Sequence, residues 1–417
     1  MKNNTSTITL FTIVFFSLIS WNVYPCTTFV IHQDNKIVFG RNLDWITGTG
    51  LIMTNPRNIQ KTALIAPSEK AIKWISKYGS MTFNQIGRDL PYGGINEAGL
   101  VVEHMTLEET KYPAKDDRFA ISANQWIQFQ LDNYSTIEEV ISSDSLLRIV
   151  DATSKYHFLI CDRFGNVATI EFLDGKMVSN NQNSVPIPVL ANSTYSSSLE
   201  CYNTKGNTDS NRSLYNFGTA AQKIQNNKKS SSDSIVSDAF EILKSVSQGV
   251  GTKWSIVYDI TDMRIYFKIF ETPTIVGEQK IFMKQPGQAE IKFVNFRNFD
   301  FDCSKDVKVL NLNEDFSGAI DNQFIDYSTE INREYIAETF KFFKNWGFNL
   351  NIGAEQIDYL AKFPESFICI KKNKRHITMY LQNKRDISKF KGYSPLQLCN
   401  GLISLKPAIA YFAYTKR

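Results

Sequence analysis

The stretch from Cys26 to Trp45 limits what this 417-residue chain can fold into more than any other. Two runs of β-branched and aromatic residues flank the polar segment Gln33-Asp34-Asn35-Lys36, a pattern typical of a β-hairpin. With Asp34-Asn35 as the two-residue turn, Thr28 lies opposite Arg41 and Cys26 lies opposite Leu43. The sequence therefore predicts both a hairpin and its register.

One end of this hairpin gathers three chemically active groups. Side chains alternate between the two faces of a strand, so Cys26, Thr28, Arg41 and Leu43 share one face. On that face Cys26 and Arg41 are diagonal neighbours, and Asp44 follows just past the expected strand end. We therefore expect a thiol, a guanidinium and a carboxylate to lie close together.

The residues before Cys26 are typical of a secretory leader. Lys2 precedes an apolar run, Ile8 to Ile19, that is too short to cross a bilayer comfortably. We expect residues 1–25 to be a signal peptide and pro-segment that is removed, since cleavage after Ser20 would leave Trp21 to Pro25 to be removed later. The protein is then expected to be secreted or periplasmic without a stable membrane span. An alternative is a lipid anchor on Cys26, although Val23-Tyr24-Pro25 lacks the small residue usually found before a lipidated cysteine.

Composition narrows the classes of function. The net charge of +4 is too small to indicate nucleic acid or a membrane surface as a partner. Six cysteines are scattered along the chain without a CxxC motif, which indicates neither a dense disulfide framework nor a zinc site. We expect no metal and no cofactor.

The order of the expected elements predicts an α+β fold. Strands, two helices, strands, two helices and strands follow one another, which favours a four-layer αββα sandwich over a doubly wound parallel sheet. We place a domain at 26–285 and an additional α+β region of unknown role at 286–417. The main elements expected are helices at 120–134, 135–142, 213–225, 234–246 and 329–346, and strands at 51–56, 63–67, 100–105, 156–161, 167–173, 186–190, 253–258, 263–270, 291–296, 367–371 and 376–381.

Two local features complete this expectation. Asn96 and Gly99 suit backbone positions with positive φ in the turn before the strand at 100–105. Ser135 to Glu138 is typical of a capping box at a helix start. The basic cluster 371–375 is expected to be a solvated hairpin tip.

A cysteine that becomes the first residue carries a nucleophile and a base together. Its thiol has a reference pKa of about 8.5 and its α-amine of about 8, so the free amine can accept the thiol proton near neutral pH. Arg41 would favour the thiolate, and Asp44 would orient the amine. The alternative for Arg41 and Asp44 is a structural ion pair at the strand end. This chemistry needs no histidine, and the four histidines lie in strand-like runs where we expect structural roles.

Five motifs in order resemble the choloylglycine hydrolase and penicillin V acylase family, the linear amide C–N hydrolases of the Ntn hydrolase superfamily. They are Cys-Thr-Thr-Phe-Val at 26–30, Gly-Arg-Asn-Leu-Asp-Trp at 40–45, Gly-Ile-Asn-Glu-Ala-Gly-Leu-Val-Val at 94–102, Val-Leu-Ala-Asn-Ser-Thr-Tyr at 189–195 and Lys-Trp-Ser-Ile-Val-Tyr-Asp at 253–259. The resemblance covers roughly residues 26–275 and implies the αββα fold.

The resemblance also implies roles for single residues. Cys26 is then the nucleophile and, through its amine, the base, and Arg41 and Asp44 support it. Asn192 donates to the oxyanion, and Trp45 lines the acyl pocket.

Two positions depart from the family pattern. Asn216 stands where the family has an arginine near the start of a helix, and Arg212, four residues earlier, is expected to supply that guanidinium. Thr106 occupies the substrate-contacting place in which bile-salt-cleaving members have an asparagine.

The implied activity is hydrolysis of a small N-acyl amide through an acyl-enzyme. Candidate substrates are phenoxyacyl penicillins, N-acyl homoserine lactones, conjugated bile acids and fatty-acid amides, with bile salts the least favoured. Two alternatives are a lipid-anchored binding protein and a degenerate member without turnover. A homo-oligomer is compatible with the hydrolase and with both alternatives.

Overall fold

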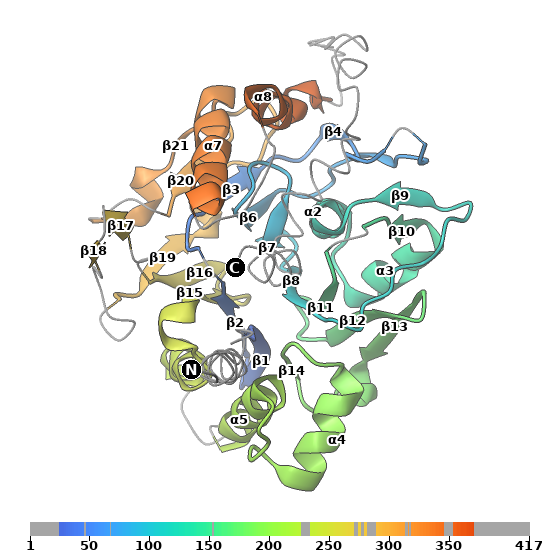
Figure 1. The fold of residues 1–417 in the computed structure, drawn as a ribbon, viewed down its shortest axis with the longest axis vertical. Coiled ribbons are helices and arrows are strands. Elements are labelled where there is room, and N and C mark those ends of the chain that lie inside the picture. The colour runs from blue at the N-terminus through green and yellow to red at the C-terminus, as the bar shows by residue number, and fades with distance from the viewer. Residues whose placement is uncertain are drawn as a thin grey trace, which may run out of the picture.

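The computed structural model describes residues 25–370, apart from 46, 67, 152–153, 227–233, 271–273, 277–278, 282–288, 313–315, 317 and 346–352. Most of the leader, the strand expected at 376–381 and the basic cluster 371–375 lie outside the described residues. Figure 1 shows the described elements from the N-terminal hairpin in blue to the C-terminal helices in orange and red.

Two antiparallel sheets form the centre of the molecule. The first has the order β14-β1-β2-β15-β16-β19, with bounds Val189–Leu190, Thr27–Gln33, Lys36–Asp44, Thr252–Asp259, Arg264–Ile269 and Lys292–Asn295. The second has the order β13-β12-β11-β8-β7-β6-β3-β20-β21, with bounds Lys176–Asn181, Val167–Leu173, Tyr156–Cys161, Val101–Thr106, Pro91–Asn96, Ser80–Asn84, Leu51–Asn55, Lys308–Asn311 and Ile325–Asp326. Their inner faces meet, as in the ring contacts of Phe83 with Trp254 and Tyr258.

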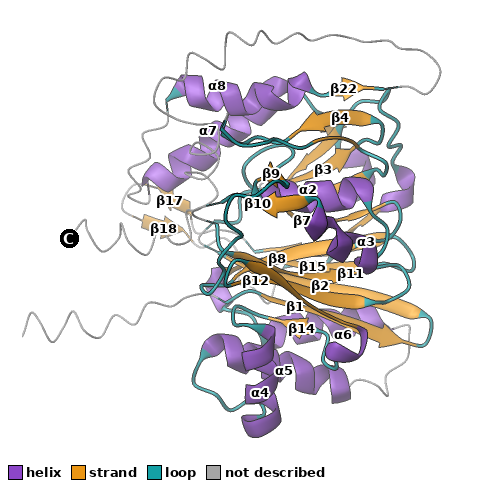
Figure 2. Cartoon of the chain, turned by 90° about the vertical axis from the view of Figure 1, so that its right-hand side faces the viewer, coloured by secondary structure: helices purple, strands orange, loops and turns teal. Residues whose placement is uncertain are grey.

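Helices cover the outer face of each sheet. Helices α5 (Arg212–Asn226) and α6 (Ile235–Ser245) pack on β1 and β2 of the first sheet, and α2 (Ala123–Asn133) packs on β7 and β8 of the second. Figure 2 shows this order of layers, with α5 and α6 on one side of the strands and α2 and α3 (Ile137–Ser142) on the other. The predicted αββα sandwich is confirmed.

Smaller sheets and a further helix lie outside the two large sheets. Small sheets pair β9 (Phe119–Ile121) with β10 (Leu147–Ile149), β17 (Thr274–Val276) with β18 (Gln279–Ile281), and β4 (Ile59–Thr62) with β5 (Lys73–Ile75) and β22 (Ile368–Cys369). Helix α4 (Tyr195–Lys205), with Thr194 as N-cap, was not among the expected elements. None of the described helices is long and apolar enough to cross a membrane.

Several local expectations need correction. The strand expected at 63–67 is instead β4 at 59–62, and beyond it the backbone N–H of Leu64 donates to the side chain of Gln125. The capping box begins one residue later, at Thr136 with Glu139. Gly99 has φ +85°, but Asn96 stays extended, because its Oδ1 caps the turn by accepting from the N–H groups of Ala98 and Leu100.

Strands β19, β20 and β21 continue the two large sheets. Strand β19 pairs with β16 of the first sheet, while β20 pairs with β3 of the second. A disulfide joins Cys303 to Cys369, next to the pairing of β22 with β4. The boundary at 285/286 and the role of the last region stay predictions.

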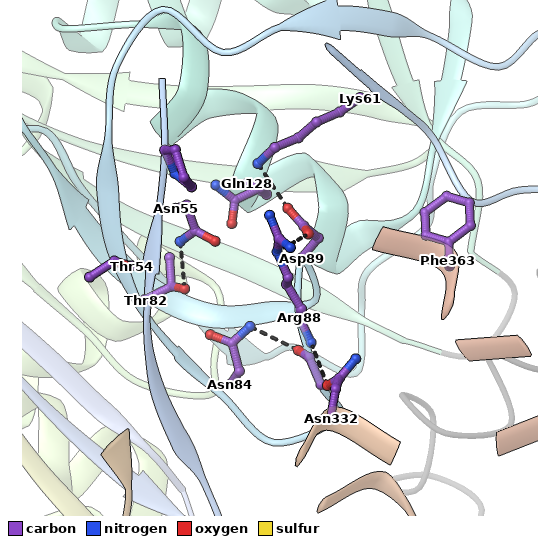
Figure 3. A network of polar contacts seen from close by, with 12 residues as sticks. Thr54, Asn55, Lys61, Thr82, Asn84, Arg88, Asp89, Gln128, Asn332 and Phe363 are labelled. Atoms are coloured by element: carbon purple, nitrogen blue, oxygen red, sulfur yellow. Dashed lines mark hydrogen bonds and ion pairs between the residues drawn. The ribbon is translucent and has the colours of Figure 1, made fainter. Parts of the chain in front are cut away.

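A buried ionic cluster joins Lys61 of β4, Asp89 of the β6–β7 connection and Asp132 of α2 (Figure 3). Helix α7 (Thr329–Asn345) approaches it through Asn332, which accepts from the backbone N–H of Arg88. The ammonium of Lys61 lies 2.8 Å from Asp89 and 3.0 Å from Asp132, and all three side chains are at most 2% exposed. Burial by itself lowers the pKa of Lys61, but Asp132 and Asp89 outweigh it, so this pKa is raised. The lysine is therefore held as a cation inside the protein.

We expect Lys61→Met to destabilise the fold by about 3–5 kcal/mol, because two carboxylates would lose their buried counter-charge. Chemical denaturation, read as a change of midpoint with an unchanged slope, measures this loss. Lys176→Met on the exposed end of β13 is the matched control and is expected to stay within about 0.5 kcal/mol of the parent. Equal stability of the two variants would contradict the role given to the Lys61 cluster.

Candidate active site

The hairpin of β1 and β2 has the predicted register, with Thr28 opposite Arg41 and Gln33 opposite Lys36. Cys26 comes directly before β1 and is fully buried, and its Sγ lies 3.7 Å from the backbone oxygen of Asp44, to which it donates. Asp44 is the last residue of β2, not a residue past the strand as expected, because β2 continues to pair with β15 up to Thr252. Cys26 and Asp44 are thus adjacent.

Arg41 lies on the inner face of the first sheet and is fully buried. Its Nη2 donates to the backbone oxygen of His104 at 3.3 Å, and its Nε lies 2.8 Å from Oε2 of Glu103 on β8. Burial raises the pKa of Glu103 to about 7, while Arg41 and the hydroxyl of Tyr258 act in the opposite direction. Glu103 was missed in the sequence, although a lone acid within the apolar run Val101 to Met105 signals a buried partner.

The carboxylate of Asp44 lies at a β-bulge. Its Oδ1 accepts from the hydroxyl of Thr252, and the register between β2 and β15 shifts between Thr252 and Trp254. The extra residue, Lys253, is 4% exposed, and burial lowers its pKa to about 8, with Asp44 opposing that shift. Bulges commonly redirect side chains beside active sites, and this one brings a lysine toward Asp44.

Asn192 follows β14 and forms hydrogen bonds to residues of both α5 and β8. Its backbone N–H donates to Ser213 Oγ at 2.8 Å, and its Nδ2 donates to the backbone oxygen of Thr106 at 2.6 Å. Leu190 pairs with Thr28 in the β1–β14 ladder, and continuing this register by two residues brings Asn192 level with Cys26. Because β14 itself ends at Leu190, the proximity of the Asn192 amide to the thiol is an expectation from this register.

The two candidate substrate contacts are both largely buried. Trp45 is 7% exposed and its backbone N–H donates to Gly251 at 2.9 Å. Thr106 ends β8 and is 9% exposed, and its carbonyl is the acceptor for Asn192. Both flank the end of the sandwich at which Cys26 lies.

Asn216, rather than Arg212, contacts the residues around Cys26. Its Nδ2 lies 3.4 Å from the oxygen of Pro25, 3.3 Å from Thr27 Oγ1 and 3.2 Å from the oxygen of Val246, and its side chain is fully buried. Arg212, the first residue of α5, is exposed, donates to Ser247 and lies over the ring of Tyr215. The role predicted for Arg212 stays a prediction, and the contacts favour Asn216 at that place.

The side chains of the buried residues His104 and His157 form hydrogen bonds within the fold. His104 Nδ1 lies 2.5 Å from the oxygen of Tyr92, and His157 lies between Glu171 and the oxygen of Ala191. Among the residues that the structure describes, no three His, Cys, Asp or Glu side chains are grouped to hold a metal ion.

Comparison with known proteins agrees with this geometry. Residues 26–211 match the family of linear amide C-N hydrolases, choloylglycine hydrolase family. A penicillin V acylase from Pectobacterium atrosepticum is 26% identical over 212 residues, which are 45% of this chain and 55% of that relative. This chain therefore spans only about half the length of that relative.

Solved structures share the fold. Penicillin V acylase from Agrobacterium tumefaciens has a TM-score of 0.61 at 25% identity, covering 73% of this chain and 98% of its own. A variant of conjugated bile acid hydrolase from Clostridium perfringens has a TM-score of 0.54 at 18% identity, covering 71% and 99%. The sandwich, with a cysteine directly before its first strand, defines an Ntn hydrolase fold. Residues 26–211 are thus similar to the choloylglycine hydrolase family of linear amide C-N hydrolases.

Proposed function

We propose that this protein is an exported hydrolase that uses Cys26, once residues 1–25 are removed, to cleave a small N-acyl amide. The observation that carries the proposal is the contact of the Cys26 thiol with Asp44, on a hairpin whose register makes Arg41 the diagonal neighbour of Cys26. The match of residues 26–211 to the family of linear amide C-N hydrolases supports the same reaction. The substrate, export and the free amino terminus are parts of the proposal.

The reaction would begin with the amine of Cys26 accepting the proton of its own thiol. The thiolate attacks the amide carbonyl, and the C–N bond breaks as the ammonium returns its proton to the departing amine. An acyl thioester remains on Cys26. Water, deprotonated by the same amine, then attacks the thioester and releases the acid and the thiol.

The neighbours of Cys26 would stabilise these steps. Asp44 lies beside Cys26 and would orient the new amine, and the positive charge of Arg41 favours the thiolate. The Nδ2 of Asn192 would leave the carbonyl of Thr106 and donate to the oxyanion of the tetrahedral intermediate.

Two features support export. The apolar run before Cys26 is typical of a signal sequence. The Cys303–Cys369 disulfide is of the kind that persists in oxidising compartments.

The substrate class is proposed from the relatives. Both the curated relative and the structure with the higher TM-score are penicillin V acylases, so penicillin V is the first substrate to test. N-acyl homoserine lactones, fatty-acid amides and conjugated bile acids complete the panel.

The test is turnover of this panel by the processed protein, with rapid quenching and intact mass measurement. We expect at least one substrate to be hydrolysed and an acyl group to appear on Cys26 before steady state. Hydrolysis of none of them by processed, folded protein would contradict the proposed substrate class. An acyl group on a different residue would contradict the assignment of the nucleophile.

A further inference from the structure

A buried carboxylate between the two sheets has no part in the reaction described so far. Glu103 comes from β8 of the second sheet, and Arg41 comes from β2 of the first, so their 2.8 Å ion pair spans the interface between the sheets. Both side chains are 0% exposed. A buried ion pair needs good geometry and further hydrogen bonds to offset the loss of hydration.

The position of this carboxylate is set by its neighbours. Gly93 faces Glu103 in the β7–β8 ladder, and a Cβ at Gly93 would lie 2.0 Å from the carboxyl carbon of Glu103. The hydroxyl of Tyr258 donates to Oε1 at 2.5 Å, while Arg41 lies against Oε2. Each oxygen therefore has its own partner, and the missing side chain at position 93 makes the room.

The groups that surround Glu103 also connect it to the nucleophile. Arg41 faces it from β2, Tyr258 from β15, and Leu159 lies opposite it on β11. Burial raises the pKa of Tyr92 on β7, with Arg41 and Cys26 both acting on it electrostatically. Thr28 lies opposite Arg41 in the β1–β2 ladder, so Cys26, two residues before Thr28, is the diagonal neighbour of Arg41.

We propose that Glu103 is the positioning residue of Arg41: the ion pair fixes the guanidinium beside the Cys26 thiol and offsets part of its positive charge. This inference rests on the proposed function, because it assumes that Cys26 is the nucleophile. Its consequence is that the electrostatic field at the thiol depends on the protonation state of Glu103. Below about pH 7 the carboxyl becomes neutral, the pair weakens, and Arg41 acts on the thiol with its full charge.

The test is the rate at which iodoacetamide alkylates Cys26 in processed protein, followed by mass spectrometry from pH 5 to pH 9. In the parent protein we expect the plot of alkylation rate against pH to show an inflection near pH 7, in addition to the inflection caused by titration of the thiol. In Glu103→Gln that change is expected to disappear, and the thiol titration moves to lower pH, because Arg41 is no longer offset. With any substrate that the parent hydrolyses, kcat is expected to fall by about tenfold or more with KM within about twofold, since orientation in the transition state is lost.

Tyr258→Phe provides a second, independent variant. It keeps the charge pair but removes a hydrogen bond that lowers the pKa of Glu103, so the change near pH 7 is expected to move to higher pH. Tyr266→Phe on β16, whose ring packs on Phe293 outside this cluster, is the matched control and should leave the profile unchanged.

The outcomes separate this inference from the proposed function. Alkylation needs no substrate, so the effect of Glu103→Gln on the pH dependence of Cys26 alkylation can be measured even if the substrate panel gives no turnover. An unchanged alkylation profile and unchanged kcat in Glu103→Gln would overturn the inference and leave the nucleophile assignment standing. If Glu103→Gln does not fold, an unmoved profile in Tyr258→Phe overturns it equally.

Discussion

Cys26→Ala is expected to lower amide hydrolysis by more than about 10⁴-fold, because the variant lacks the atom that forms the acyl-enzyme. The fully buried thiol lies against Asp44 and is expected to meet the substrate only after residues 1–25 are removed. The measurement is kcat/KM on the best substrate of the panel, with thermal unfolding to confirm the fold. We expect binding of that substrate to persist, since the rest of the site is unchanged.

The matched control for this loss is Cys201→Ala. Cys201 is a second free thiol, on α4, where its Sγ contacts Asp209. We expect this variant to keep the parent activity. Turnover by Cys26→Ala at the parent rate would eliminate the acyl-enzyme mechanism, whereas equal losses in both variants would indicate a general effect of removing a thiol.

Asn192→Ala is expected to lower kcat by about 10²–10³-fold, the usual cost of removing one oxyanion donor. KM is expected to change little, because the donor acts on charge that develops only in the transition state. Asn192 also bonds Thr106, so the melting temperature is measured alongside the rate.

Asn207→Ala, which removes a half-buried amide that donates to Gln222, serves as its control and should retain full activity. A raised KM with unchanged kcat in Asn192→Ala would show that Asn192 binds the ground state, contrary to its proposed role.

The hairpin register could be predicted because it depends on local features alone. The turn at Asp34 and the alternation of its strands determined that Thr28 lies opposite Arg41, as observed. The αββα order followed similarly from the sequence of strands and helices. The register needs only neighbours in the chain, and the layer order was favoured by the order of the elements along it.

Contacts between distant segments were beyond such reasoning. Glu103 pairs with Arg41 across two sheets, and nothing in either segment specifies how the sheets pack. Arg212 and Asn216 lie one helical turn apart on α5, so the choice between them depended on how that helix packs on β1. The bulge at Lys253 was likewise hidden, because a shift of register depends on both paired strands.

The central claim is that the working enzyme begins at Cys26, since only then does an amine lie beside the thiol. Intact mass and N-terminal sequencing of the secreted, active protein test this most directly. The expected result is a chain that starts with an unblocked Cys26. Active protein that still carries residues 1–25, or that has an acylated Cys26, would contradict the account.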